Sequence, residues 1–143
     1  MTIRRLLPSL AAISLTVIGC GTTPPTQAEA SSAAPDTNLD YSNAWRIEVS
    51  EGANSDGEIL FRVTPKDGTS KDVKVVIDNG TSEDHVARVI KDTFEDQLDT
   101  SRYDVEIDDG EDVLVKKDLT EARFALVLVS STVQSVRLHV QKE

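Results

Sequence analysis

The sequence predicts an α+β fold: a mostly antiparallel β-sheet with a single helix packed on one face, in the rough order β-β-β-α-β-β-β-β. Three observations support this fold class. Apolar and polar residues alternate with a period of two in several short runs, as in half-buried strands. One stretch has the spacing of apolar residues that is typical of a helical face. Asp-Gly and Asn-Gly pairs, which tolerate the positive φ angles of tight turns, lie between the runs.

Three predicted strands lie before residue 80. In each of them apolar residues occupy alternate positions: Trp45, Ile47 and Val49, then Ile59, Phe61 and Val63, then Val73, Val75 and Ile77. Turn signals follow the strands at Asp56-Gly57, Asp67-Gly68 and Asn79-Gly80. Because the runs are close in sequence and are joined by turn signals, we expect them to pair as a three-stranded meander.

The period changes after residue 80, where one helix is predicted. Its apolar face consists of Val86, Val89, Ile90, Phe94 and Leu98. Thr81 is placed to cap the helix, and Glu83 and Asp84 follow in the first turn, where the helix dipole favours negative charge. A helix with one apolar stripe needs a sheet on which to pack.

Four predicted strands complete the domain. Residues 103–108 alternate between apolar and acidic side chains, and Asp109-Gly110 marks a hairpin turn before the chain returns over residues 113–116. Every residue from 124 to 129 is apolar, which predicts a central strand that is covered on both faces. Residues 136–140 alternate again and form the last predicted strand.

The chain is acidic and contains a single cysteine. Its 143 residues carry a formal net charge of −10. Such a charge argues against nucleic acid as a partner, because phosphate groups repel it. Since Cys20 is the only cysteine, no disulfide can form within the chain, and packing must stabilise the domain.

The first 19 residues have the composition of a secretory signal. Arg4 and Arg5 form a basic start, and a mainly apolar segment follows over residues 6–18. Spanning a bilayer requires about 20 apolar residues, so this segment is too short for a transmembrane helix. The motif Val17-Ile18-Gly19-Cys20 resembles the lipobox of bacterial lipoproteins, with two branched apolar residues, a small residue and a cysteine.

This resemblance, which covers the leader and the cleavage site, implies that the leader is cut before Cys20 and that the cysteine sulfur receives a diacylglyceryl group. The new amino group is often acylated as well. We therefore expect a signal peptide over residues 1–19, a lipidated cysteine with a disordered Thr, Pro, Ala and Ser linker over residues 20–40, and a single domain over residues 41–143. The resemblance implies a protein that is exported and lipid-anchored to the cell membrane. Because Gly21 is not acidic, it also implies the outer membrane, facing the periplasm or the surface, if the host is Gram-negative.

No catalytic motif is present in the sequence. His85 and His139 have no partner at a useful spacing. There is no nucleophile elbow, phosphate-binding glycine loop, zinc-type histidine pair or dinucleotide fingerprint. We therefore predict no catalytic residue, no enzyme activity and no cofactor apart from the covalent lipid on Cys20.

One hairpin collects six carboxylates that are candidates for binding calcium, which prefers oxygen ligands: Asp104, Glu106, Asp108, Asp109, Glu111 and Asp112. Two observations argue against such a site. The first three residues of the set spread along a strand by about 6.6 Å per step. Gly110 is not where a helix-loop-helix calcium site requires its glycine. The alternative is a solvated acidic face that keeps an exposed sheet edge from pairing with other chains.

Leu60, Val76 and Leu114 are large apolar residues on the nominally polar faces of their predicted strands. If the three residues cluster in one exposed patch, they indicate a protein interface. If a second layer of the structure covers them, they belong to the core. We expect a noncatalytic binding or assembly module, tethered by lipid, that contacts another envelope protein or cell-wall material. The alternative is a small membrane-tethered enzyme or enzyme inhibitor that acts on a periplasmic or cell-wall substrate, since paired carboxylates can perform glycosidic chemistry.

Overall fold

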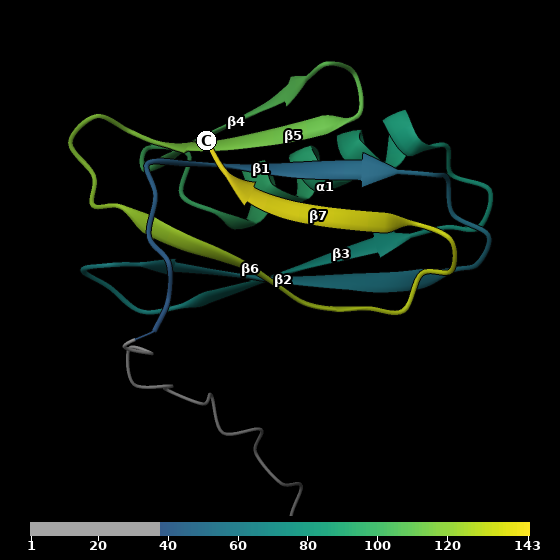
Figure 1. Ribbon diagram of the computed structural model, residues 1–143, viewed down its shortest axis with the longest axis horizontal. Coiled ribbons are helices and arrows are strands. Elements are labelled where there is room, and N and C mark those ends of the chain that lie inside the picture. The colour runs from purple at the N-terminus through teal and green to yellow at the C-terminus, as the bar shows by residue number, and fades with distance from the viewer. Residues whose placement is uncertain (1–37) are drawn as a thin grey trace, which may run out of the picture. The chain divides into compact units, whose positions relative to one another are not determined.

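The computed structural model describes residues 38–143, so the predicted leader, Cys20 and most of the predicted linker lie outside the described residues. The described part contains one helix and seven strands in the predicted order (Figure 1). The α+β fold class is confirmed. The elements are β1 Ala44–Ser50, β2 Gly57–Pro65, β3 Lys71–Ile77, α1 Glu83–Gln97, β4 Tyr103–Asp108, β5 Asp112–Lys117, β6 Phe124–Ser131 and β7 Arg137–Lys142.

The strands form two antiparallel sheets. The larger sheet has the order β4-β5-β1-β7, and the smaller sheet has the order β3-β2-β6. Among the three strands before the helix, only β2 and β3 pair with each other, so the predicted three-stranded meander is wrong. The connection between β1 and β2, residues 51–56, is too long for a tight hairpin turn and crosses to the other sheet. Buried Ala53 holds this connection through a 2.8 Å hydrogen bond from its N–H to the carbonyl of Thr81.

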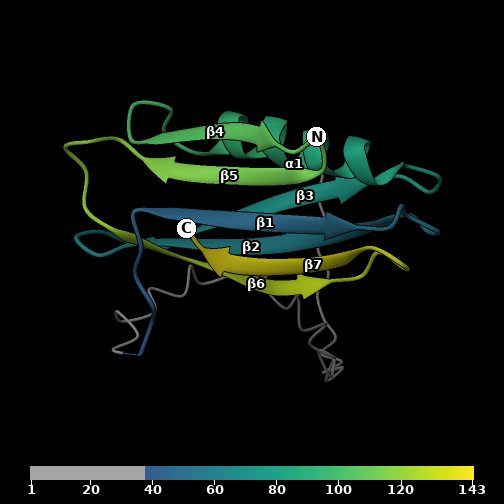
Figure 2. The ribbon, with the colours of Figure 1, turned by 45° about the horizontal axis from the view of Figure 1, so that its top comes forward.

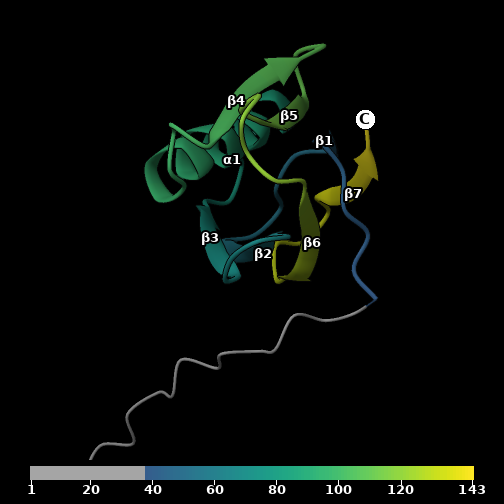
Figure 3. The same ribbon diagram turned by 90° about the vertical axis from the view of Figure 1, so that its left-hand side faces the viewer.

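The helix fills the space between the two sheets. The sheets approach each other at β6 and β7 and diverge toward β3 and β4, where α1 packs against both of them (Figure 2, Figure 3). The ring of Phe94 on α1 meets the ring of Phe61 on β2 edge to face, with 5.3 Å between centroids and 71° between planes. Both side chains are fully buried, so this contact joins the helix to the smaller sheet within the core.

A second set of contacts joins the two sheets directly. Tyr103 at the start of β4 packs edge to face on Phe124 at the start of β6, with 5.1 Å between ring centroids. The carbonyl of Phe124 accepts a hydrogen bond from the indole Nε1 of Trp45 (2.8 Å) and another from the N–H of Ser42 (2.9 Å). The beginning of β6 is therefore fixed by residues that belong to, or lead into, strands of the larger sheet.

Strand β6 lies at the edge of the smaller sheet, so its predicted central position is wrong. Phe124 and Leu126 point inward and are buried, as expected for one face of the strand. On the outer face, however, Val127 is 39% exposed and Val129 is 43% exposed. A run that is apolar at every position thus leaves one apolar face partly open to solvent.

The start of α1 differs from the prediction by one residue. Ser82, and not Thr81, is the N-cap, and its side chain forms no capping hydrogen bond. The hydroxyl of Thr81 donates instead to the carbonyl of Asp78 (2.7 Å). Glu83 lies in the first turn as predicted, and its Oε2 accepts a hydrogen bond from the N–H of Glu51 (3.0 Å). Among the residues that the structure describes, no helix has the length and apolarity needed to cross a membrane.

Replacing Phe94 tests whether the helix stabilises the domain as the core contacts indicate. We expect Phe94→Ala to lower the free energy of unfolding by about 3–5 kcal/mol, because it removes a buried aromatic side chain and leaves a cavity. Urea denaturation followed by far-UV circular dichroism measures this change. Arg88→Ala, on the exposed side of the same helix, is the matched control and should change stability by about 0.5 kcal/mol or less. Equal losses in the two variants would contradict the assignment.

Candidate functional site

The carboxylates of the β4–β5 hairpin do not converge on one point. Arg46 of β1 pairs with Asp108 (Nη2 to Oδ2, 2.7 Å), with Asp112 (Nη1 to Oδ2, 2.9 Å) and with Glu143 (Nε to Oε1, 2.5 Å). Its side chain is only 16% exposed. The hydrogen bond to Glu143, followed by those to Asp112 and Asp108, raises the pKa of Arg46 above its ordinary value. One guanidinium therefore ties the tip of the hairpin to β1 and to the last residue of the chain.

The remaining predicted calcium ligands divide into two groups. Lys116 of β5 pairs with Glu106 (2.7 Å) and Asp104 (3.3 Å). Asp109 and Glu111 lie in the turn, where Asp109 and Gly110 have the positive φ angles expected of an Asp-Gly turn. Within residues 38–143 no three His, Cys, Asp or Glu side chains are placed to hold a metal ion. Four of the six carboxylates thus act as ion-pair partners in the larger sheet.

The structure brings together two of the three predicted interface residues. Leu60 on β2 and Val76 on β3 lie on the outer face of the smaller sheet, where the β2–β3 register makes them diagonal neighbours. Val76 is 59% exposed and Leu60 is half-buried. Leu114 lies on β5 in the larger sheet and does not join them.

Two residues of β6 complete an apolar patch on this face. Val127 pairs with Arg62 of β2, which makes it a diagonal neighbour of Leu60. The register shifts between Leu60 and Phe61, and Val129 is the extra residue of this β-bulge. We call Leu60, Val76, Val127 and Val129 the outer apolar patch. The two valines were not predicted to be exposed, because a run that is apolar at every position predicts a strand covered on both faces.

The charged side chains beside the outer apolar patch are paired with one another. Arg62 donates to both carboxylate oxygens of Asp72, at 2.6 and 2.9 Å. These hydrogen bonds hold the pKa of Asp72 below its ordinary value. Lys74 pairs with Glu58 at 2.6 Å. The four charges cancel, so this face is locally neutral in a chain whose net charge is −10.

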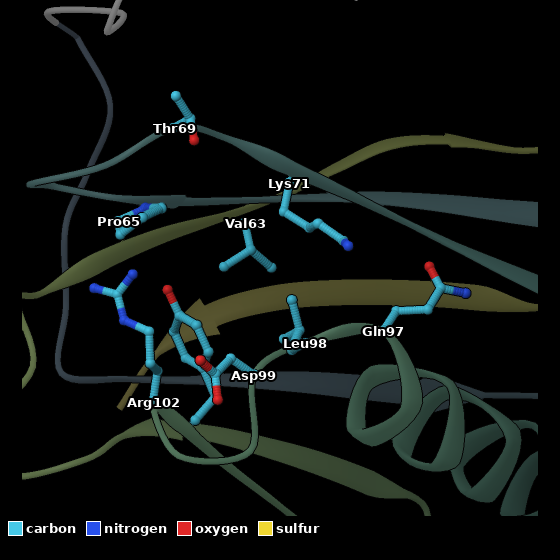
Figure 4. Close-up of a pocket in the computed structure, with 9 residues that line it drawn as sticks. Val63, Pro65, Thr69, Lys71, Gln97, Leu98, Asp99 and Arg102 are labelled. Atoms are coloured by element: carbon cyan, nitrogen blue, oxygen red, sulfur yellow. The ribbon is translucent and has the colours of Figure 1, made fainter.

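A pocket of about 360 Å³ lies between the β2–β3 hairpin and the segment that joins α1 to β4 (Figure 4). Four apolar residues of the lining, Val63, Pro65, Leu98 and Tyr103, are buried. In the view of Figure 4, Val63 lies between the side chains of Lys71 and Arg102, and Leu98 lies below Lys71. The remaining lining residues are Thr69, Gln97 and Asp99.

The two cations of the pocket differ in their partners. Arg102 forms ion pairs with Glu121 and, at 3.4 Å, with Asp67. These pairs, the hydrogen bond to Glu121 first, raise the pKa of Arg102. Lys71 forms no ion pair with any residue from 38 to 143. Lys71 is therefore the cation of the pocket that is available to a ligand.

The polar groups at the end of α1 complete the pocket. Asp99 Oδ1 accepts hydrogen bonds from the hydroxyl (2.6 Å) and the N–H (2.9 Å) of Ser101, and these bonds lower the pKa of Asp99. Burial raises the pKa of the Tyr103 hydroxyl. Sequence reasoning did not select these residues because the pocket is assembled from four separate segments, none of which carries a motif. His85 and His139 lie exposed on α1 and β7, away from the pocket lining.

No protein-family model matches the chain, and no match was found among the curated proteins.

Calcium titration tests the acidic hairpin. We expect 10 mM calcium to leave the melting temperature unchanged relative to sodium chloride of equal ionic strength, because binding would have to displace Arg46 or Lys116 from their carboxylates. A site with a dissociation constant of about 1 mM would add about 1.4 kcal/mol of stability under these conditions. A saturable rise in melting temperature that requires Asp108 and Asp112 would contradict the ion-pair interpretation.

Proposed function

We propose that this chain is a lipid-anchored lipoprotein of the cell envelope and that its folded domain is a noncatalytic binding module. In this proposal Cys20 carries the lipid, residues 20–40 form the tether, and the domain contacts another envelope protein. The observation that carries the proposal is the outer apolar patch on the smaller sheet.

The composition of this face suits a protein partner. Clustered exposed apolar side chains are typical of interaction sites, whereas scattered single ones need no explanation. Covering a half-exposed valine would contribute about 1 kcal/mol, so several such residues supply a useful share of a binding free energy. Because Arg62 with Asp72 and Lys74 with Glu58 already neutralise each other, the partner does not have to bring a compensating charge.

The tether adds to this modest affinity. A flexible chain of 20 residues has an end-to-end distance on the order of 25 Å, which lets the domain reach neighbours on the same membrane. Confinement at a surface raises the effective concentration of each partner for the other, to the millimolar range for short flexible linkers. A weak contact through the outer apolar patch therefore becomes sufficient for a stable complex.

Lysine substitutions on the outer apolar patch test the proposal. In cells of the native host, brief chemical cross-linking should trap the full-length chain in a discrete larger species. We expect Val76→Lys and Val127→Lys each to reduce that species about tenfold, because each places a hydrated charge in an apolar contact. Immunoblotting of membrane fractions measures the change.

Two control variants make the result specific. His139→Lys adds a lysine on the exposed face of β7 in the larger sheet and should leave the cross-linked species unchanged. Cys20→Ser should release the chain from the membrane or leave it unprocessed. The amount of the cross-linked species should then decrease, because the chain is no longer anchored beside its partner. If His139→Lys reduced the species as much as the two valine variants do, the outer apolar patch would not be the contact surface.

A further inference from the structure

Gln97 at the end of α1 occupies the place of a neighbouring strand. Its side-chain Oε1 accepts a hydrogen bond from the N–H of Lys74 (3.2 Å), and its Nε2 donates to the carbonyl of Lys74 (3.0 Å). These are the two bonds that a strand would form with the free edge of β3 at this residue. The amide of Gln97 thus occupies the edge of β3 at Lys74.

The position of Gln97 identifies the unpaired backbone groups of β3. In an antiparallel pair, alternate residues direct their N–H and carbonyl groups away from the partner strand. Since the groups of Lys74 point away from β2, those of Asp72, two residues earlier, do so as well. No described residue outside the sheet forms a backbone hydrogen bond with Asp72, and Asp72 is exposed. A free stretch of edge therefore lies beside Lys71, which lines the pocket.

We propose that the β3 edge at Asp72 and the adjoining pocket together bind an extended peptide. A peptide residue opposite Asp72 would form two main-chain hydrogen bonds and direct its side chain to the outer face. The residues on either side of it direct their side chains to the face of Lys71, because side chains alternate along a strand. One of these side chains enters the pocket between Val63 and Leu98.

The lining of the pocket defines the chemistry of this peptide. Val63, Leu98 and Tyr103 accommodate an apolar side chain, and a volume of about 360 Å³ is large enough for that of a leucine. Lys71, with no ion pair among the described residues, selects a carboxylate next to the apolar residue, whereas Arg102 is already paired with Glu121 and Asp67. The ligand class is thus a short extended segment with an apolar residue beside an acidic one. This site is independent of the outer apolar patch, which lies on the opposite face of the same sheet.

Titration with defined peptides tests the site. The probes are five-residue peptides with blocked ends and threonine at the outer positions, one with leucine followed by glutamate at its centre and one with lysine in place of the glutamate. In ¹H–¹⁵N spectra of the protein, the glutamate peptide should move the amide resonance of Asp72 downfield, because that amide gains a hydrogen bond. The methyl resonances of Val63 and Leu98 should shift with the same binding curve.

Charge reversal supplies the matched comparison. The glutamate peptide should bind the wild-type protein about tenfold more tightly than the lysine peptide, and Lys71→Glu should reverse this preference. If charge reversal disturbs folding, Lys71→Gln replaces it as the test variant. This variant should bind the glutamate and lysine peptides equally well. Lys142→Glu on β7 should leave the preference unchanged. The proposal is overturned if the Asp72 amide does not move at millimolar peptide, or if sodium acetate alone reproduces all the shifts.

Discussion

The packing of Phe94 against Phe61 is the contact on which the rest of the domain depends. Seven strands of this length do not close into a barrel here, because β3 and β4 lie too far apart to pair. The helix occupies the space between them, and its buried face completes the core that both sheets share. Without the helix the inner faces of β3, β4 and β5 would be open to water. The single helix is therefore required by the arrangement of the two sheets.

This arrangement gives the two outer faces different roles. On the larger sheet, Arg46 and Lys116 join carboxylates from β4 and β5 into a network that covers the surface with charge. On the smaller sheet the ion pairs are local, and aliphatic side chains occupy the space between them. The acidic residues on β4 also discourage pairing at that exposed edge. The outer apolar patch contrasts with the charged outer face of the larger sheet, and it is the basis of the proposed partner contact.

Local patterns in the sequence predict the elements of this fold well, whereas the pairing of the strands is not a local property. Alternation at Trp45, Phe61 and Val75 identifies strands, because it reports which side chains are buried. The same alternation does not report which strand lies alongside, so the division into two sheets could not be foreseen. The prediction of a central strand at residues 124–129 was wrong for a related reason. An apolar outer face is compatible either with a covering layer or with a surface reserved for a partner, and the sequence alone does not distinguish them.

The candidate sites were predicted less well than the fold. Leu60 and Val76 were selected because they interrupt polar faces, and the register of β2 and β3 brings them together. Leu114 also interrupts the polar face of its strand, but it lies on the larger sheet. The pocket depends on segments that are 40 residues apart, from Val63 to Tyr103, and no spacing rule connects them. Arg46 could not be identified as the centre of the acidic network, since its partners lie on β4, on β5 and at the end of the chain.

The most direct test of the proposed contact is photo-cross-linking from single positions on the two outer faces. A photoreactive phenylalanine analogue at position 127 of the smaller sheet, or at position 139 of the larger sheet, is irradiated in intact cells of the native host. If the outer apolar patch contacts an envelope protein, position 127 should yield one discrete protein adduct and position 139 should yield none. Adducts of equal yield from both positions, or lipid adducts alone from position 127, would contradict the account.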